Sequence, residues 1–170
     1  MTLSRACPNP SRTEVAASAD LDPRTPVIVG VGQAVERIDD PDYQGLSPVE
    51  LAARAAQAAL ADSGGQAHRL VAEIDTIATT RQLENSTPGA PAPLGKSTKF
   101  PLSLACRLGA KPRRAVLEVA GGQSPQHLVN EFTREICEGR SDVVLLAGAE
   151  AISTVRHFAD AERRAGFADD

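Results

Sequence analysis

The sequence is poor in aromatic residues, with no tryptophan, one tyrosine and four phenylalanines among its 170 residues. A core built with so few rings depends on Ala, Val, Leu and Ile, and small side chains favour helices packed closely on a sheet. Apolar residues make up 42% of the chain, which is enough to form such a core in a globular protein.

Long apolar runs and an excess of positive charge are also absent. No stretch approaches the ~20 apolar residues of a membrane span, and residues 1–24 lack the apolar region of a secretory signal. The formal net charge of −4 does not favour a surface for nucleic acid or anionic lipid. We therefore expect a cytoplasmic protein that has neither nucleic acid nor a membrane as a partner.

The cysteines form an odd set without CxxC spacing, namely Cys7, Cys106 and Cys137. Such a set indicates free thiols in a reducing compartment. Cys106 and Cys137 fall on predicted helices, where we expect buried positions. No His, Cys or carboxylate residues cluster at ligand spacing along the sequence, so we expect no metal site.

Composition divides the chain into three parts. Residues 1–24 are rich in Ser, Pro and Ala and are predicted to be a flexible arm, and residues 25–150 carry the periodic apolar pattern of an α/β domain. Residues 151–170 are charged and compatible with a helix, and we expect them to form a helical or frayed tail that is truncated. Residues 80–98 are rich in Asn, Ser, Thr, Gly and Pro, which predicts a long loop.

The first predicted strand is Val27–Val31, with Gly30 and Gly32 near its end. Two glycines after a strand suggest a nucleotide-binding module as one alternative. The third glycine of that fingerprint is replaced by Val35, and a charged loop follows instead of a helix. The glycines more simply allow the backbone to pass close to a neighbouring element.

Two helices and a strand follow. Ser47 and Glu50 form a capping box around Pro48, which predicts a helix that ends near Gly64. The residues 74–79 predict a second strand, and residues 100–108 predict a short helix closed by Gly109.

The most informative stretch is 113–150, which predicts strand, turn, helix and strand. Residues 115–120 and 142–149 are short apolar runs typical of parallel strands buried on both faces. Between them, Ser124 suits the helix N-cap, Pro125 the first helical position and Gly139 the helix end. Val129, Phe132 and Ile136 lie at helical spacing and predict the buried face. The turn points its N–H groups and the helix dipole at one place, where a nucleophile would be activated.

This order of elements resembles the N-terminal half of thiolases, in the branch related to sterol-carrier-protein thiolases. The opening run PVIVGVG at 26–32, the Ala-rich helix after it and the AGAE motif at 147–150 carry the resemblance, which covers residues 25–150. It implies a thiolase-like α/β fold, with a mostly parallel sheet of three to five strands and packed helices. It also implies the acyl transfer between coenzyme A thioesters of lipid metabolism, as in acetyl-CoA acetyltransferases.

The chain departs from the family at the nucleophile. Thiolases carry a Cys at the turn, and the equivalent position here is Gly122. A register shifted by two residues would offer Ser124 instead, with His127 on the same helix as a base. Backbone N–H groups of Gly121, Gly122, Gln123 and Ser124 could still hold the carbonyl oxygen of a coenzyme A thioester. We expect no tightly bound cofactor.

Thiolases are built from two similar halves, and the motifs of the second half are absent from this sequence. The resemblance therefore implies a protein with little or no activity alone. The alternative is a non-catalytic subunit that binds acyl-CoA or a partner chain. For partners we expect a homodimer, paired through the strand at 113–120, or a complementary thiolase-like chain.

Overall fold

Three parallel strands form the centre of the structure, a computed structural model that describes residues 22–65, 67–86, 89, 92–159 and 167. They are β1 (Thr76–Thr80), β2 (Arg114–Glu118) and β3 (Val144–Ala147), in the order β2-β1-β3. Ile77 of β1 lies in register with Ala115 of β2 and with Leu145 of β3. The sequence predicts that β2 and β3 are buried on both faces of the sheet, and this is wrong. Both are half-buried strands at the edges of the sheet, and only β1 is buried along most of its length.

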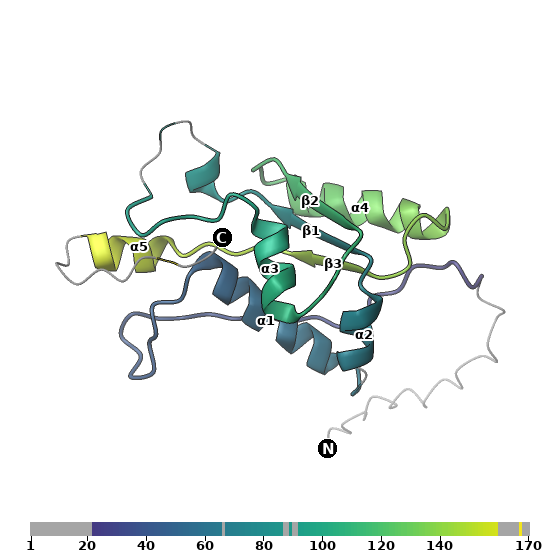
Figure 1. Cartoon of the computed structure of the whole chain (residues 1–170), viewed down its shortest axis with the longest axis horizontal. Coiled ribbons are helices and arrows are strands. Elements are labelled where there is room, and N and C mark those ends of the chain that lie inside the picture. Colours follow the sequence, from purple (N-terminus) through teal and green to yellow (C-terminus); the bar gives the residue numbers. More distant parts are fainter. Residues whose placement is uncertain (1–21, 66, 87–88, 90–91, 160–166, 168–170) are drawn as a thin grey trace, which may run out of the picture.

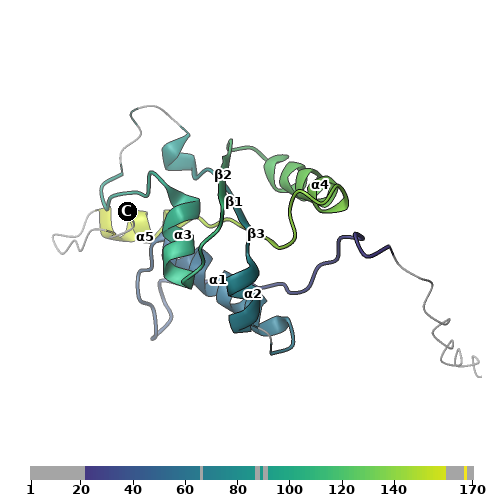
Figure 2. The ribbon, with the colours of Figure 1, turned by 45° about the vertical axis from the view of Figure 1, so that its right-hand side comes forward.

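Helices cover both faces of this sheet, as Figures 1 and 2 show, with α4 on one side and α1, α2 and α3 on the other. In the described part of the chain the helical elements are α1 (Pro48–Asp62), α2 (Ala67–Glu73), the 3-10 turn η1 (Leu83–Asn85), α3 (Phe100–Leu108), α4 (Ser124–Cys137) and α5 (Ile152–Ala159). The α/β class with a parallel sheet is therefore confirmed. The short helix α2 has no counterpart among the predicted elements.

Local sequence signals account for most helix ends. At α1, Ser47 Oγ accepts from the Glu50 N–H, while the Glu50 side chain accepts from the Ser47 N–H, so the predicted capping box is present. Gly109 ends α3 in the left-handed conformation at φ 70°, which glycine adopts without steric cost. Helix α4 differs from expectation, because it begins at Ser124 and its N-cap is Gln123.

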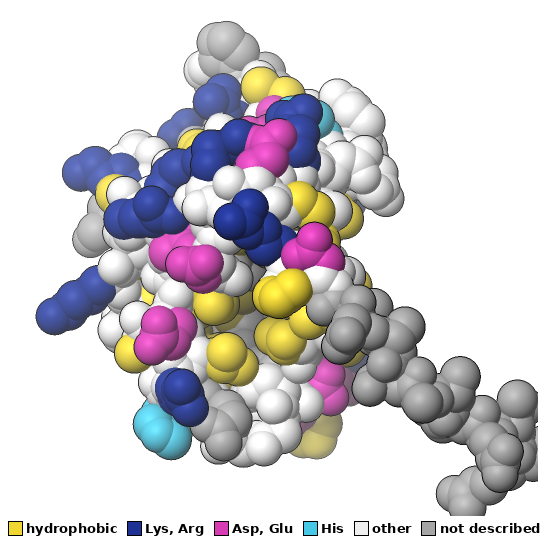
Figure 3. Space-filling view, turned by 90° about the vertical axis from the view of Figure 1, so that its right-hand side faces the viewer, with side chains coloured by type: hydrophobic (Ala, Val, Ile, Leu, Met, Phe, Trp, Pro, Cys, Tyr) yellow, Lys and Arg dark blue, Asp and Glu magenta, His cyan; other side chains and the backbone are white. Residues whose placement is uncertain are grey.

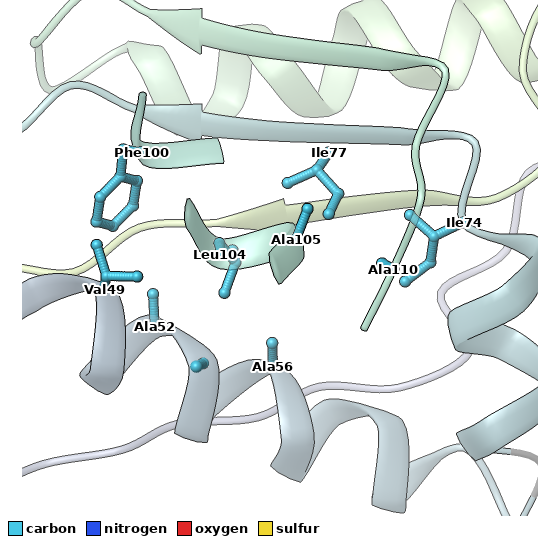
Figure 4. Packing of buried hydrophobic residues seen from close by; sticks show 10 residues of the cluster. Val49, Ala52, Ala56, Ile74, Ile77, Phe100, Leu104, Ala105 and Ala110 are labelled. Carbon is cyan, nitrogen blue, oxygen red and sulfur yellow. The ribbon is translucent and has the colours of Figure 1, made fainter. Parts of the chain in front are cut away.

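The larger core lies between the sheet and the pair α1 and α3. Figure 4 shows Val49, Ala52 and Ala56 of α1 facing Leu104 of α3, below Ile77 of β1. The small side chains of the alanines allow α1 to approach the sheet closely. Leu104 of α3 is fully buried and fills the space that the alanines leave open.

A smaller core lies on the opposite face, between the sheet and α4. Leu128 and Phe132 are buried there against Ala78 of β1. Of the face predicted for α4, Phe132 is buried as expected, but Val129 is 43% exposed. The helix is rotated so that Leu128 replaces Val129, which keeps the spacing of four residues to Phe132.

The stretch predicted as the first strand is extended but pairs with no other strand among the described residues. It lies along α1, where a Cβ on Gly30 or Gly32 would come within 2.1 Å of a helix carbonyl oxygen, that of Ala59 or Ala55. These glycines therefore allow the backbone to approach α1 closely, as the sequence predicts.

Asp75 joins the starts of β1 and β3. Its carboxylate accepts hydrogen bonds from the Asp142 N–H at 2.6 Å, the Val143 N–H at 3.2 Å, and the hydroxyls of Thr76 and Ser141. Burial alone raises the pKa of Asp75, but these bonds together outweigh it and hold the pKa below its ordinary value.

Cys106 and Cys137 are exposed rather than buried, because each lies on the outer side of its helix, while Cys7 and the rest of residues 1–21 lie outside the described residues. The tail contains the helix α5, as its composition allowed. None of the helices in the described ranges has the length and apolarity needed to cross a membrane.

Candidate functional site

The candidate site is the turn that joins β2 to α4. The φ angle of Gly122 is not in the left-handed region, and a Cβ built on this residue would meet no atom within 4 Å. The neighbouring Gly121 is different, since its Cβ would lie 2.6 Å from the Gln123 side chain, which folds back over it. The position that the resemblance assigns to the nucleophile is therefore open, and it carries no side chain.

Ser124 is held inside the turn. It is only 1% exposed, its Oγ donates to the Val119 carbonyl oxygen at 2.7 Å, and its N–H donates to the Gly121 carbonyl oxygen at 3.0 Å. The predicted role as N-cap is replaced by these two bonds, which fix the shape of the turn. Because both its hydroxyl proton and its N–H are in use, Ser124 is poorly placed as a nucleophile or as an oxyanion donor.

His127 contacts two carboxylates and no serine among the described residues. Its Nδ1 lies 2.8 Å from Glu118 Oε2, and its Nε2 lies 3.7 Å from Glu131 Oε2 one helical turn further on. Glu118 Oε1 also accepts from the Val119 N–H at 2.8 Å. This backbone bond, together with the bond from His127, holds the pKa of Glu118 below its ordinary value.

Glu118, His127 and Glu131 form the one group of metal-ligand atoms found in the described ranges, all within 4.8 Å of one another. The spacing along the sequence did not reveal it, because a strand and a helix bring the three together. The sequence signal that could have revealed this group is the pair His127 and Glu131, which lie four residues apart on one face of a helix. The direct contact of His127 with Glu118 already satisfies both groups without an ion.

A second feature lies where β1 and β3 end. A cavity of about 200 Å³ is bordered by Leu83, Glu150 and Arg156, among others. Glu150 belongs to the AGAE motif, and its Oε1 accepts from the Leu83 N–H at 2.8 Å. Burial raises the pKa of Glu150 above its ordinary value in spite of this bond. The turn residues Gly121 and Gly122 do not border the cavity.

The carboxyl ends of parallel strands are where α/β sheets carry their sites, and here the turn after β2 and the cavity beside β3 share that edge. This arrangement agrees with the thiolase-like α/β class that the sequence motifs suggest.

The comparison with solved structures agrees with this class. One matching structure is described as a monomeric SCP2-thiolase-like protein, type 1, from Mycobacterium smegmatis; the match has a TM-score of 0.59 at 50% sequence identity and covers 74% of this chain. No protein-family model and no curated protein matches the chain. The resemblance to the thiolase superfamily is therefore confirmed at the level of sequence and fold.

The match covers only 23% of the Mycobacterium smegmatis protein, so this chain spans less than a quarter of that relative's length. The match therefore extends to the fold of this part and not to the activity, ligands or partners of the complete protein.

Proposed function

We propose that this chain is a thiolase-like module that forms no acyl-enzyme of its own. The observation that carries the proposal is the turn itself: Gly122 offers no side chain, and Ser124 Oγ is buried and bonded to Val119. His127 is bound to Glu118 and Glu131 and does not contact the serine. A transferable acyl group needs an activated nucleophile, and no side chain of this turn supplies one.

The acyl transfer of thiolases would then depend on polypeptide that this chain lacks. Coenzyme A thioesters are the ligand class that the resemblance suggests for the assembled protein. The N–H groups of Gly122 and Gln123 make no hydrogen bond to other described residues and precede the first turn of α4. They could donate to a thioester carbonyl oxygen, which supports binding rather than turnover.

A second candidate function is association with a partner that completes the fold. It is favoured by apolar side chains left in solvent on the segment before α1, where Ile28 is 84% and Val27 69% exposed. The relative is described as monomeric. This favours a complementary polypeptide, and not a second copy of the chain, as the partner that covers these apolar side chains.

The test of the first proposal is incubation of the purified chain with acetyl-CoA. We expect no release of free coenzyme A above the rate of hydrolysis in buffer, and no acetyl adduct by intact-mass spectrometry. Ser124→Ala is the matched control, because it removes the one hydroxyl of the turn. An acetyl adduct that maps to Ser124 and disappears in the variant would contradict the proposal.

A further inference from the structure

The two ring nitrogens of His127 have different surroundings. Nδ1 lies 2.8 Å from Glu118 Oε2, which is a hydrogen-bond distance. An ionised carboxylate can only accept, so in the neutral imidazole this contact places the single ring proton on Nδ1. Nε2 then has a lone pair, and it lies 3.7 Å from Glu131 Oε2. Two acceptors at this distance repel each other unless a cation lies between them.

The distance between His127 Nε2 and Glu131 Oε2 suits a zinc ion. Tetrahedral Zn²⁺ binds a histidine nitrogen at about 2.0 to 2.1 Å and a carboxylate oxygen at about 2.0 to 2.2 Å, so its ligand atoms lie about 3.4 Å apart. The observed 3.7 Å is slightly longer, and a small rotation of either side chain closes the difference. Helix α4 holds both residues on one face, because they lie four positions apart.

Glu118 fixes the orientation of the imidazole. Its side chain is 17% exposed, and its Oε1 accepts from the Val119 N–H at 2.8 Å while Oε2 accepts from His127. Histidines that bind a metal usually donate their other ring N–H to a carboxylate, which fixes the tautomer and makes the ligand more basic. The group of three, whose ligand atoms lie within 4.8 Å of one another, therefore divides into two metal ligands and one positioning carboxylate.

The carboxylates of this group lack the basic partners that other acidic residues have. Figure 3 shows acidic side chains set in a band of Lys and Arg on one face of the molecule. On α4 itself, Glu135 pairs with Arg114 at 2.8 Å. Within the described ranges, Glu118 and Glu131 have His127 as their one ion-pair partner. A divalent cation would supply the positive charge that two carboxylates and a neutral imidazole lack.

We propose that His127 Nε2 and Glu131 Oε2 bind one Zn²⁺ ion, and that Glu118 is the residue that positions His127. The side chains of His127 and Glu131 are 57% and 32% exposed, so water completes the coordination and can be exchanged for another ligand. The site replaces the expectation from sequence that the chain has no metal site. It does not depend on the proposed absence of an acyl-enzyme.

The experiment is titration of the full chain with zinc chloride by calorimetry at about pH 8, where histidine is mostly neutral in water. The three cysteines are first alkylated with iodoacetamide, because thiolates also bind zinc. We expect one ion to bind per chain. His127→Gln and Glu131→Gln should each abolish this binding. The matched control is His68→Gln, which should keep it, because His68 is an exposed histidine outside the group.

The role of Glu118 needs its own variants. Glu118→Ala removes the acceptor for Nδ1 and should weaken zinc binding by about 10- to 100-fold. Glu118→Gln keeps a carbonyl oxygen at this place and should restore part of the affinity. Nitrogen NMR should find the ring proton of His127 on Nδ1 in the parent, and zinc should shift the Nε2 resonance. An unchanged circular dichroism spectrum checks the fold of each variant.

Several results would overturn the zinc site. The parent could show no saturable binding, or binding could persist in both His127→Gln and Glu131→Gln. A ring proton found on Nε2 of the parent would also refute it, because this nitrogen would then have no lone pair for a metal. Equal loss of zinc in Glu118→Ala and Glu118→Gln, with the proton still on Nδ1 in both, would refute the positioning role of Glu118.

Discussion

The equivalence of Gly122 with the thiolase nucleophile can be tested by placing a thiol there. Gly122→Cys is compatible with the structure, because a Cβ at this position meets no atom within 4 Å and the backbone is not left-handed. Replacing a glycine under these conditions lowers the entropy of the unfolded chain. The variant should therefore be as stable as the parent or more stable, by up to about 1 kcal/mol.

The new thiol should react faster than an ordinary one. A negative charge near a helix N-terminus gains about 0.3 to 1 kcal/mol, which lowers a thiol pKa by about 0.2 to 0.7 from its ordinary value of about 8.5. At the upper limit, the thiolate fraction at pH 7 rises from about 3% to about 14%. Lower basicity reduces thiolate nucleophilicity about twofold, so the net gain in rate is about twofold.

The assay is alkylation by iodoacetamide between pH 6 and pH 10, with each cysteine followed separately by peptide mass spectrometry. Cys137, at the other end of α4, and Cys106 are exposed and serve as internal references. The midpoint for the new thiol should lie below about 8.5. A midpoint at or above that value, with a rate no faster than that of Cys137, would refute the assignment of the turn as a thiolate-stabilising position.

Three further predictions concern the fold. Leu104→Ala should lower the free energy of unfolding in a urea titration by about 2 to 5 kcal/mol, because Leu104 is fully buried. Leu102 lies on the same helix but is half exposed, so Leu102→Ala should cost less than about 1 kcal/mol. Equal losses in the two variants would contradict the position of the core described above. Asp75→Asn should destabilise the chain by about 2 kcal/mol at neutral pH. Because its folded pKa is lowered, the stabilisation by Asp75 is present above the ordinary pKa of about 3.9 and is lost as pH falls through the folded pKa; a difference between the proteins that persists undiminished at pH 2 would contradict this. Glu150→Gln keeps an acceptor for Leu83 and removes a charge that burial disfavours, so the variant should be at least as stable at pH 7. Any advantage should vanish as the acid of the parent becomes protonated, and a loss of stability at pH 7 would contradict the reasoning.

Sequence patterns predicted best the elements that local chemistry determines. The capping box at Ser47 and the left-handed Gly109 fix the ends of α1 and α3 through contacts within a few residues. The thiolase-like class also followed from local order, since turn, helix and strand succeed one another along 113–150. Such features do not depend on what else packs around the chain.

The predictions that were wrong concern residues whose conformation depends on contacts with other parts of the chain. The group of Glu118, His127 and Glu131 was missed because it joins a strand to a helix. The role of Ser124 changed because its hydroxyl finds the Val119 carbonyl oxygen, five residues back, rather than a helix N–H. The stretch at 27–31 has the composition of a strand, but strand pairing needs a neighbour that composition cannot supply.

The apolar composition of residues 27–31 bears on the proposed association with further polypeptide. Residues with strand composition that remain in solvent cost hydrophobic free energy in the isolated chain, and Val27, Ile28 and Val29 are all more than half exposed. The edge strands show the same mismatch, since β3 reads Val-Leu-Leu-Ala yet is only half-buried. A sequence written for the isolated fold would place polar residues or lysine on such an edge. The exposed apolar side chains of this stretch are therefore the observation that favours the proposed association with complementary polypeptide.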